Sequence, residues 1–518
     1  MTCGVPGHGA FATAAAPDIV KYNTKDVRRN TLTEKGKVMS MKHALVAAWV
    51  SLALVGVARA NDLVQVYDDA VRFDPQIHAA DATRMAARES SPQALAALLP
   101  QVSGNWAISR GKQVENTVEP FPSPLNPAVL EALPLDATSY TDERQYNLQL
   151  TQSVFSWANW KTLSKAHKQV AQAEADYKTA QENLIQRVAT AYFNVLAAQD
   201  VVDADQAALN ADSLQLDQDN KRYDVGLIPI TNVKETQAAH DAAAAALIDA
   251  KRQLANQLFA LREITDQDYP TLSKPGDVMA LNPPQPADPQ HWVDVSMDQN
   301  LSLISSRLAA DIARDSVEIS RSGHLPSVAI TATRGAQYED VNENEAFGGP
   351  PASIRFPQSG NDSTIQLQVT VPIFEGGQVQ SQVRQAQYQW IAAKYNMQQV
   401  SRQTERNARD AYQGLVSKIA QVNALKQGLE SARVAMQATE AGYEVGTRTT
   451  VDVLQERQAL VLAQTNYAQA RYDYMNDVIA LQLAAGTLTR DTLVELNKSL
   501  TALMGGPPTP EPTAPLQR

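Results

Sequence analysis

The segment GYEVGTRTTVDVLQ, which begins at Gly442, brings a phenol, a guanidinium group and a carboxylate together beside a glycine. Tyr443, Arg448 and Asp452 could form hydrogen bonds and ion pairs, and a ring of carboxylates attracts cations. Each residue also has an ordinary explanation. Asp452 is the fourth residue of a capping box begun by Thr449, Arg448 is a solvated turn charge, and Tyr443 packs on a helix seam.

No catalytic or metal-binding pattern accompanies these residues in the sequence. The seven histidines are scattered and form no HExxH or paired ligand set, and glycine motifs for nucleotide or ester hydrolysis are absent from the sequence. The single cysteine, Cys3, precedes the predicted export signal, so the exported chain has no disulfide, thiolate metal site or cysteine for lipid attachment. We therefore expect no enzyme activity, no cofactor and no resident metal.

The beginning of the sequence has the features of an export signal. A short basic region opens at Met41, an apolar run covers 44–58, and Ala58-Arg59-Ala60 gives a small-x-small cleavage pattern. We expect 41–60 to be a signal peptide. Residues 1–40 are then an over-extended start rather than part of the exported protein.

The mature chain is therefore expected to begin at Asn61. Residues 1–60 carry a net charge of +5, so their removal would lower the net charge from −11 to −16. This acidity argues against nucleic acid as a partner. No later stretch reaches about 18 uninterrupted apolar residues, so we expect no transmembrane helix.

The rest of the sequence is an internal two-fold repeat, with halves at 61–285 and 286–490. Apolar and polar residues alternate with a period of two in four stretches, two in each half, which predicts four strands with one apolar and one polar face each. These stretches are 102–109, 146–154, 328–333 and 365–371. The intervening segments 110–143 and 335–362 are rich in Pro, Gly, Asn and acids, and we expect them to be loops.

Long heptad repeats occupy the remainder of each half, and they predict helices wound around each other. The apolar seams run through 188–223, 233–261, 415–443 and 453–481. No Pro or Gly interrupts the sequence from Trp157 to Val225, which allows a helix about 100 Å long. Gly226 and Gly446 are expected to end the outgoing helices, and Pro229 or the Thr449 capping box to begin the returning ones.

Four amphipathic strands cannot close a barrel alone, because single-chain outer-membrane barrels begin at about eight strands. One possibility is a soluble, half-buried sheet. The other is closure by sister chains, which pairs the strand edges that lipid would leave unsatisfied. The export signal and the length of the hairpins favour the second possibility.

Six collinear segments across 61–500 resemble the TolC family of outer-membrane channel-tunnel proteins, which serve type I secretion and multidrug efflux. They are NDLVQVYDDAVRFDPQI from Asn61, TAYFNVLAAQDVV from Thr190, RYDVGLIPITNV from Arg222, DQNLSLISSRLAADIAR from Asp298, GHLPSVAIT from Gly323 and AGYEVGTRTTVDVLQ from Ala441. The resemblance implies an α+β membrane protein. It would be a homotrimer in which a 12-stranded β-barrel, four strands per chain, continues into a 12-helix α-barrel tunnel.

The resemblance also assigns the remaining segments. Residues 264–300 and 487–505, which are Pro-rich or irregular in sequence, would form an equatorial belt around the tunnel. The tail 506–518 is Pro-rich and poor in apolar residues, so we expect it to be disordered.

In the TolC family the hairpin tips close the periplasmic entrance. Carried over by motif, Tyr443 and Arg448 match residues of the closing network on the second hairpin, and Thr231 matches its threonine on the first. Asp452 matches the first constricting aspartate. The resemblance therefore implies a periplasmic gate at these positions, with cation block at Asp452.

Two positions of the gate depart from the family pattern. Asn232 and Gln455 stand where the family has aspartates. We expect a latch that is less sensitive to salt at Asn232, and a weaker carboxylate trap because Gln455 is neutral. The exposed hairpin tips, Gly226-Leu227 and Gly446-Thr447, would dock a periplasmic adaptor.

The function implied by the resemblance is a passive exit duct for efflux, type I protein secretion or both. Its partners would be sister chains, the periplasmic adaptor, an inner-membrane ABC or proton-driven pump, and outer-membrane lipid. The alternative is a periplasmic coiled-coil scaffold that is anchored in the envelope and forms no channel. The sequence leaves open whether drugs, toxins or proteins are the cargo.

Overall fold

The computed structural model describes residues 61–501 except for 124, 277–278 and 348–351. The expected signal peptide, the over-extended start and the tail 506–518 lie outside the described residues. The two halves of the described chain have the same order of elements, in which short helices precede two strands and a long helical hairpin.

The first half contains three short helices, two strands and two long helices. They are α2 (Leu63–Phe73), α3 (Pro75–Arg88), α4 (Ser90–Ala96), β1 (Gln101–Pro122), β2 (Leu130–Phe155), α5 (Trp157–Asp224) and α6 (Ile230–Thr265). The second half repeats this plan and ends with an additional helix. Its elements are α7 (Pro289–Gln299), α8 (Leu301–Arg321), the 3-10 turn η1 (Ser322–His324), β3 (Ser327–Phe347), β4 (Ala352–Thr370), α9 (Gln378–Glu444), α10 (Thr450–Ala485) and α11 (Arg490–Thr501).

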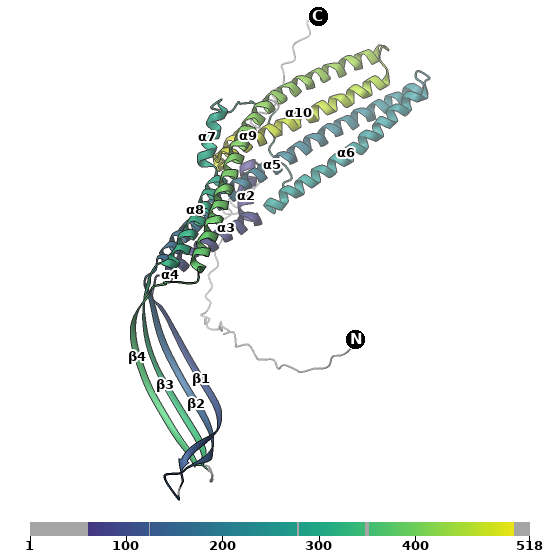
Figure 1. Cartoon of the computed structure of the whole chain (residues 1–518). Helices are drawn as coiled ribbons and strands as arrows, with labels where there is room; N and C mark the ends of the chain where they lie inside the picture. The colour runs from purple at the N-terminus through teal and green to yellow at the C-terminus, as the bar shows by residue number, and fades with distance from the viewer. Residues whose placement is uncertain (1–60, 124, 277–278, 348–351, 502–518) are drawn as a thin grey trace, which may run out of the picture. The chain divides into compact units, whose positions relative to one another are not determined.

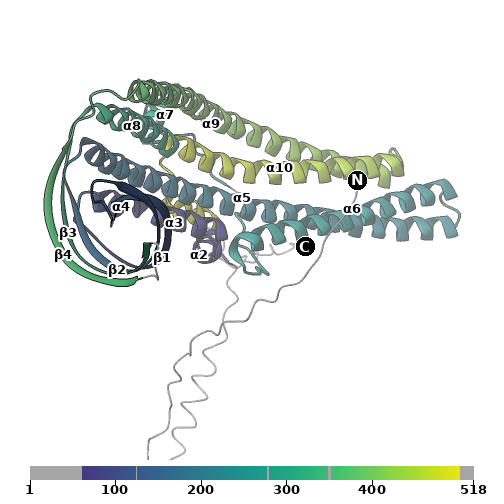
Figure 2. The same ribbon diagram turned by 60° about the horizontal axis from the view of Figure 1, so that its bottom comes forward.

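The four strands form one antiparallel sheet in the order β1-β2-β3-β4. In Figure 2 the strands follow a curved arc. Among the described residues, β1 and β4 pair on one side only, so the sheet has two open edges. The alternating stretches of the sequence lie in strands, except that Val371 is one residue beyond the end of β4.

The prediction of long loops at 110–143 and 335–362 was wrong. The ladder continues from Gln101↔Thr151 to Pro122↔Leu130, and from Ser327↔Thr370 to Glu345↔Ala352. Apolar alternation marks only the part of a strand that has an apolar environment on one side. Backbone pairing needs no such environment, so the ladder runs on where both faces are polar.

One face of the sheet is apolar near the helices and its side chains are exposed. Trp106 of β1 is 76% exposed and Ile365 of β4 is 83% exposed. Neighbouring positions in the register, such as Val102↔Leu150 and Ala332↔Ile365, extend the same face across the strands. The other face is polar. A contiguous exposed apolar surface of this kind marks contact with lipid or with another chain.

The two outgoing helices are unusually long, with 68 residues in α5 and 67 in α9. At about 1.5 Å per residue each is roughly 100 Å long. The α5–α6 and α9–α10 hairpins lie side by side, with their turns at the end away from the sheet (Figures 1 and 2). Residues of the predicted heptads, such as Val188, Val233, Leu415 and Val453, are buried on their seams.

The main hydrophobic core lies midway along these helices. Tyr192, Phe193 and Tyr472 are almost fully buried there, and the Phe193 ring is stacked on the Tyr472 ring with centroids 6.2 Å apart. Leu63 of α2 belongs to the same cluster. This core therefore joins helices of both halves where short helices surround them.

The expected belt segments are more regular than the sequence indicated. Residues 289–299 and 490–501 are the helices α7 and α11, whereas the part between α6 and α7 is extended and irregular. Proline and glycine explain the irregular part, and Pro289 begins α7 because its fixed φ suits the first helical position. Within the described chain, no helix combines the length and apolar character needed to cross a membrane.

Candidate functional site

The predicted tip residues form two similar turns. Gly226 and Gly446 have φ values of 75° and 80°, a left-handed conformation that glycine adopts without strain. The backbone N–H of Leu227 donates to the carbonyl of Arg222 at 2.8 Å, and that of Thr447 donates to Gly442 at 2.8 Å. These bonds close helix C-termini in the same way. Gly226, Leu227, Gly446 and Thr447 are all exposed, as a docking surface requires.

The second returning helix begins with the predicted capping box. Thr449 accepts a hydrogen bond from the backbone N–H of Asp452, and the Asp452 carboxylate accepts one from the backbone N–H of Thr449 at 2.8 Å. These bonds lower the pKa of Asp452 below its ordinary value, and the charge of Arg448 adds to the effect. Asp452 is thus ionised and at the surface, where it both caps the helix and presents a negative charge.

A network of hydrogen bonds joins the two hairpins just above their turns. Its centre is Asp219 of α5, which is 0% exposed. The Asp219 carboxylate accepts from Thr236 Oγ1 at 2.7 Å, from Tyr443 Oη at 3.1 Å and from Gln215 Nε2 at 3.1 Å. Arg222 Nη1 donates to Tyr443 Oη at 3.0 Å, and its guanidinium carbon lies 5.3 Å from the Tyr443 ring centroid. We call these five residues the tip network.

Two further contacts connect the hairpins near the tips. Asn232 Nδ2 of α6 donates to Thr450 Oγ1 of α10 at 3.2 Å, and Thr450 is buried. Arg457 of α10 forms an ion pair with Asp212 of α5 at 2.5 Å, with both side chains nearly buried, and lies 3.7 Å from Glu440 of α9. Removal of one partner from a buried ion pair is strongly destabilising, because the other charge stays buried and unpaired.

The structure therefore places the predicted gate residues in two groups. Tyr443 and Asn232 connect the hairpins within one chain. Thr231 and Gln455 are exposed, and Arg448 lies at the turn against Gly442. Within the described residues, the side chains of Thr231, Arg448 and Gln455 form no hydrogen bond or ion pair.

The other members of the tip network, Asp219, Gln215, Arg222 and Thr236, were not among the predicted site residues. A signal for them does exist in the sequence. Asp212 and Asp219 are seven residues apart, as are Gln215 and Arg222, so polar side chains follow the period of the apolar seam. Polar residues at seam positions need partners inside the bundle, which marks them as members of a network.

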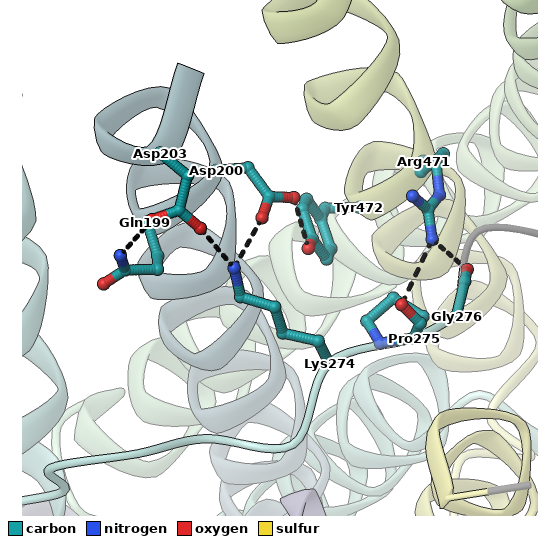
Figure 3. A network of polar contacts seen from close by, with 8 residues as sticks. All are labelled: Gln199, Asp200, Asp203, Lys274, Pro275, Gly276, Arg471 and Tyr472. Atoms are coloured by element: carbon teal, nitrogen blue, oxygen red, sulfur yellow. Dashed lines mark hydrogen bonds and ion pairs between the residues drawn. The ribbon is translucent and has the colours of Figure 1, made fainter. Parts of the chain in front are cut away.

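A second polar network fastens the irregular segment that follows α6 to the long helices (Figure 3). Lys274 Nζ donates to Asp200 at 2.8 Å and to Asp203 at 2.9 Å, both on α5. Tyr472 Oη of α10 donates to Asp200 at 2.8 Å, and Arg471 donates to the carbonyl oxygen of Gly276 at 2.5 Å. Burial raises the pKa of the Tyr472 phenol, so it remains a donor. The extended segment thus fixes α5 to α10 midway along the hairpins.

No set of three or more His, Cys, Asp or Glu side chains in the described chain is arranged to hold a metal ion. Asp212, Asp219 and Asp452 instead accept hydrogen bonds from Thr, Tyr, Gln and Arg donors. The chemistry of the site is therefore that of reversible polar contacts between helices.

Comparison with known proteins gives consistent matches over almost the whole described chain. The family model "Outer membrane efflux protein" matches residues 66–266 and 292–487. Outer membrane protein TolC of Escherichia coli is 33% identical over 483 residues, which cover 91% of this chain and 93% of TolC. Alkaline protease secretion protein AprF of Pseudomonas aeruginosa is 26% identical over 443 residues, or 83% of this chain and 85% of AprF. The Campylobacter jejuni CmeC outer membrane channel has the same fold, with a TM-score of 0.66, 20% identity, and coverage of 85% of this chain and 89% of CmeC.

Proposed function

The chain belongs to the outer membrane efflux protein family, and we propose that it forms the passive exit duct of an efflux or type I secretion system. It is an outer-membrane protein that extends into the periplasm. In the proposed assembly three copies close a 12-stranded β-barrel in the membrane and a 12-helix tunnel below it. Type I secretion is included because AprF, a relative, is named for protease secretion.

The open sheet is the observation that carries this proposal. Four strands with one exposed apolar face and two open edges are incomplete both as a soluble sheet and as a single-chain barrel. Pairing of β4 with β1 of a sister chain satisfies both edges and directs the apolar faces outward. The three-fold symmetry of this trimer also arranges the hairpins of the three chains around one axis.

The belt and the domain plan follow from this assembly. We assign 61–285 and 286–490 to the two repeats, and 264–300 with 487–505 to the equatorial belt. The network of Lys274 supports this assignment, because it fastens the irregular segment to α5 near the main core. The belt would then hold the hairpins together midway along the tunnel.

We place the periplasmic gate at the tips. The tip network and the Asn232–Thr450 bond hold the two hairpins of a chain together, while Arg448 and Thr231 remain exposed for contacts between chains. Docking of an adaptor on Gly226-Leu227 and Gly446-Thr447, followed by an inner-membrane pump, would loosen these bonds and open the duct. The neutral Asn232 makes its link insensitive to salt.

Planar-bilayer recording of the purified full-length protein tests the channel. A duct gives step conductance and a trimeric mass in detergent, and electron microscopy shows a hollow axis. The scaffold alternative gives a protein without conductance, and a monomer in solution would contradict the duct. Recovery of an adaptor and a pump by pull-down from cells would identify the system that it serves.

The gate is tested by Asp452→Ala. We expect this variant to lose most of the block by divalent or trivalent cations, since three Asp452 carboxylates would approach one axis. Asp241→Ala is a matched control, because Asp241 is an exposed acid on α6 of the other hairpin. Undiminished cation block in Asp452→Ala would show that the constriction lies elsewhere.

A further inference from the structure

Three arginines lie at one border of the apolar face of the sheet. Arg110 follows Ile108 on the same face of β1, and Arg144 is the next same-face residue beyond Tyr146 on β2. Arg334 follows Ala332 on β3. Each is the first charged residue met on that face when a strand is followed away from the helices. We call Arg110, Arg144 and Arg334 the arginine border.

The apolar face has the height of a membrane. On β2 it extends from Tyr146 to Phe155, close to 30 Å of strand at about 3.3 Å per residue. A strand tilt of about 40° reduces this to roughly 23 Å, close to the height of about 25 Å of the apolar band of outer-membrane barrels. Aromatic side chains lie at both limits, with Trp106 and Tyr146 near the arginine border and Trp157 and Trp160 near the helices.

The arginine border is displaced from strand to strand as tilted strands require. Arg144 pairs with Ile108, two residues nearer the helices than Arg110. Arg334 pairs with Leu148 and is displaced further in the same direction. The other limit of the apolar face, the one near the helices, is displaced in the same direction. It lies at Val102 on β1, which pairs with Leu150, and at Phe155 on β2, which is nearer the helices. In tilted strands, a displacement in one direction of this kind brings the three arginines closer to one level of the membrane.

Two of these three charges form no ion pair among the described residues, although the Asp142 carboxylate lies within electrostatic range of Arg144. Arg110 donates to Asp142, but Arg144 and Arg334 form no ion pair in the described part of the chain. The guanidinium carbon of Arg144 lies 5.9 Å from the Tyr338 ring centroid. The cross-strand neighbours of Arg334 are the uncharged Leu148 and Ser363.

Other charges on this face do not compensate for them. Farther from the helices, Asp340 pairs with Arg355. Lys112 adds a positive charge above Tyr140, with its Nζ 5.6 Å from the ring centroid. The border is therefore cationic and faces outward beside an apolar surface.

We propose that the arginine border binds the phosphate-bearing headgroups of outer-leaflet lipids. This inference rests on the proposed function, which turns the apolar face toward lipid and the helices toward the periplasm. The border then lies at the level of the outer-leaflet headgroups. A guanidinium group donates two parallel hydrogen bonds to phosphate, and a phosphate there satisfies Arg144 and Arg334, which the protein leaves unpaired. In a trimer the border would encircle the barrel.

The test compares lipid retention by the detergent-purified trimer, measured by native mass spectrometry. The probes are diphosphoryl lipid A, the same lipid without phosphates, and inorganic phosphate. We expect the double variant Arg144→Gln/Arg334→Gln to retain the phosphorylated lipid about tenfold less than wild type, the equivalent of about 1.4 kcal/mol. Retention of the dephosphorylated lipid should not change, and inorganic phosphate should compete weakly because the acyl chains contribute to binding.

Arg355→Gln is the matched control, since Arg355 lies on the same face, one same-face position beyond the level of Arg110, but is ion-paired with Asp340. It should stay within about twofold of wild type, because its guanidinium group is already satisfied. Lysine at 144 and 334 should restore most retention. Equal retention by the double variant and wild type, or an equal loss for the dephosphorylated lipid, would overturn the proposal.

Trimer mass and conductance are recorded on the same samples. If wild type itself is monomeric or non-conducting, the proposed function fails, whereas the lipid proposal fails on lipid retention alone. If the double variant does not assemble, Arg334→Gln and Arg144→Gln are measured singly against Arg355→Gln.

Discussion

Tyr223 and Tyr443 occupy equivalent places before the two hairpin turns, yet their surroundings differ. Tyr223 is 43% exposed, whereas Tyr443 is half-buried and bonded to Asp219 and Arg222. Both precede a glycine with positive φ, so the turns themselves are alike. The repeat therefore fixes the shape of each tip. The packing of α10 against α5 brings the hairpins together, so that Tyr443 finds partners on α5 that Tyr223 lacks on its own side.

The starts of the returning helices differ in a related way. Pro229 caps α6 without a side-chain hydrogen bond, while α10 has the Thr449–Asp452 capping box. The first hairpin supplies the buried acids Asp212 and Asp219, and the second supplies Arg457 and Tyr443, which bind them across the hairpins. The two halves of the repeat therefore contribute complementary groups to the contacts that join the hairpins.

The largest effect is expected for Arg457→Met, which leaves Asp212 buried without its partner. The free energy of unfolding should fall by about 3–5 kcal/mol, and Asp212→Leu/Arg457→Met should recover most of it. Thermal unfolding measures both. Arg433→Met is the control. Arg433 pairs with Glu430 of the same helix, α9, and both side chains are exposed, so this substitution should cost less than about 1 kcal/mol. If both arginine variants lose the same free energy of unfolding, the ion pair between the hairpins is no more important for stability than an ion pair within one helix.

The next largest effect is expected for Tyr443→Phe, a loss of about 1–3 kcal/mol, because Arg222 and the buried Asp219 each lose a hydrogen-bond partner. Tyr223→Phe should change stability by less than about 0.5 kcal/mol, since Tyr223 is exposed. Chemical denaturation and protease cleavage at the tips measure the pair. The comparison between the tyrosines breaks down if the two variants behave alike.

Position 182 extends the comparison above the tips, because Glu182 of α5 is buried while Arg402, at the equivalent place in α9, is exposed. Burial raises the pKa of Glu182 to about 7, from 4.5. Between these two pH values the Glu182 carboxyl group is protonated in the folded state and ionised in the unfolded chain. The free energy of unfolding therefore falls as pH rises from about 4.5 to about 7.

Glu182→Gln should be more stable than wild type by about 2 kcal/mol at pH 8 and nearly equal to it at pH 4. Melting temperatures across this range provide the measurement. Arg402→Gln should show no pH-dependent difference from wild type. A constant effect of Glu182→Gln over the range would mean that the carboxyl group has the same pKa in the folded and the unfolded protein.

A smaller effect is expected for Thr449→Ala, about 1 kcal/mol, because α10 loses its N-cap oxygen. Thr449→Ser should keep the bond and the stability. Thr231→Ala, an exposed threonine at the start of α6, should stay within about 0.5 kcal/mol. Urea denaturation resolves the three variants, and an equal cost at 231 and 449 would contradict the unequal capping of the two hairpins.

The smallest effect concerns acid titration of Asp452. The capping bonds lower its pKa below the ordinary 3.8, so their contribution to stability is present at neutral pH and is lost as pH falls through that lowered value. Carbon NMR of the carboxyl group should show a midpoint below 3.8 in wild type and a higher one in Thr449→Ala. An unchanged midpoint in Thr449→Ala would show that the hydrogen bonds of the cap do not lower the pKa of Asp452.

The sequence alone determined the regular parts of this protein. Period-two alternation located the strands, seven-residue spacing located the long helices, and Gly226 and Gly446 located their ends. The resemblance to a known family, later supported by matches across most of the chain, supplied its class. These features depend on residues close in sequence, whose conformational preferences need no distant partner.

Tertiary structure decided the rest. The strands continue through 110–122 and 130–143 because backbone pairing extends beyond the apolar face, which no side-chain pattern records. Tyr443 bonds to Asp219 rather than to a residue near it in sequence because two hairpins, separated by more than 200 residues, pack side by side. The arginine border likewise arises from the register of three strands. Local sequence specifies each element, but only packing brings distant polar groups within hydrogen-bonding distance.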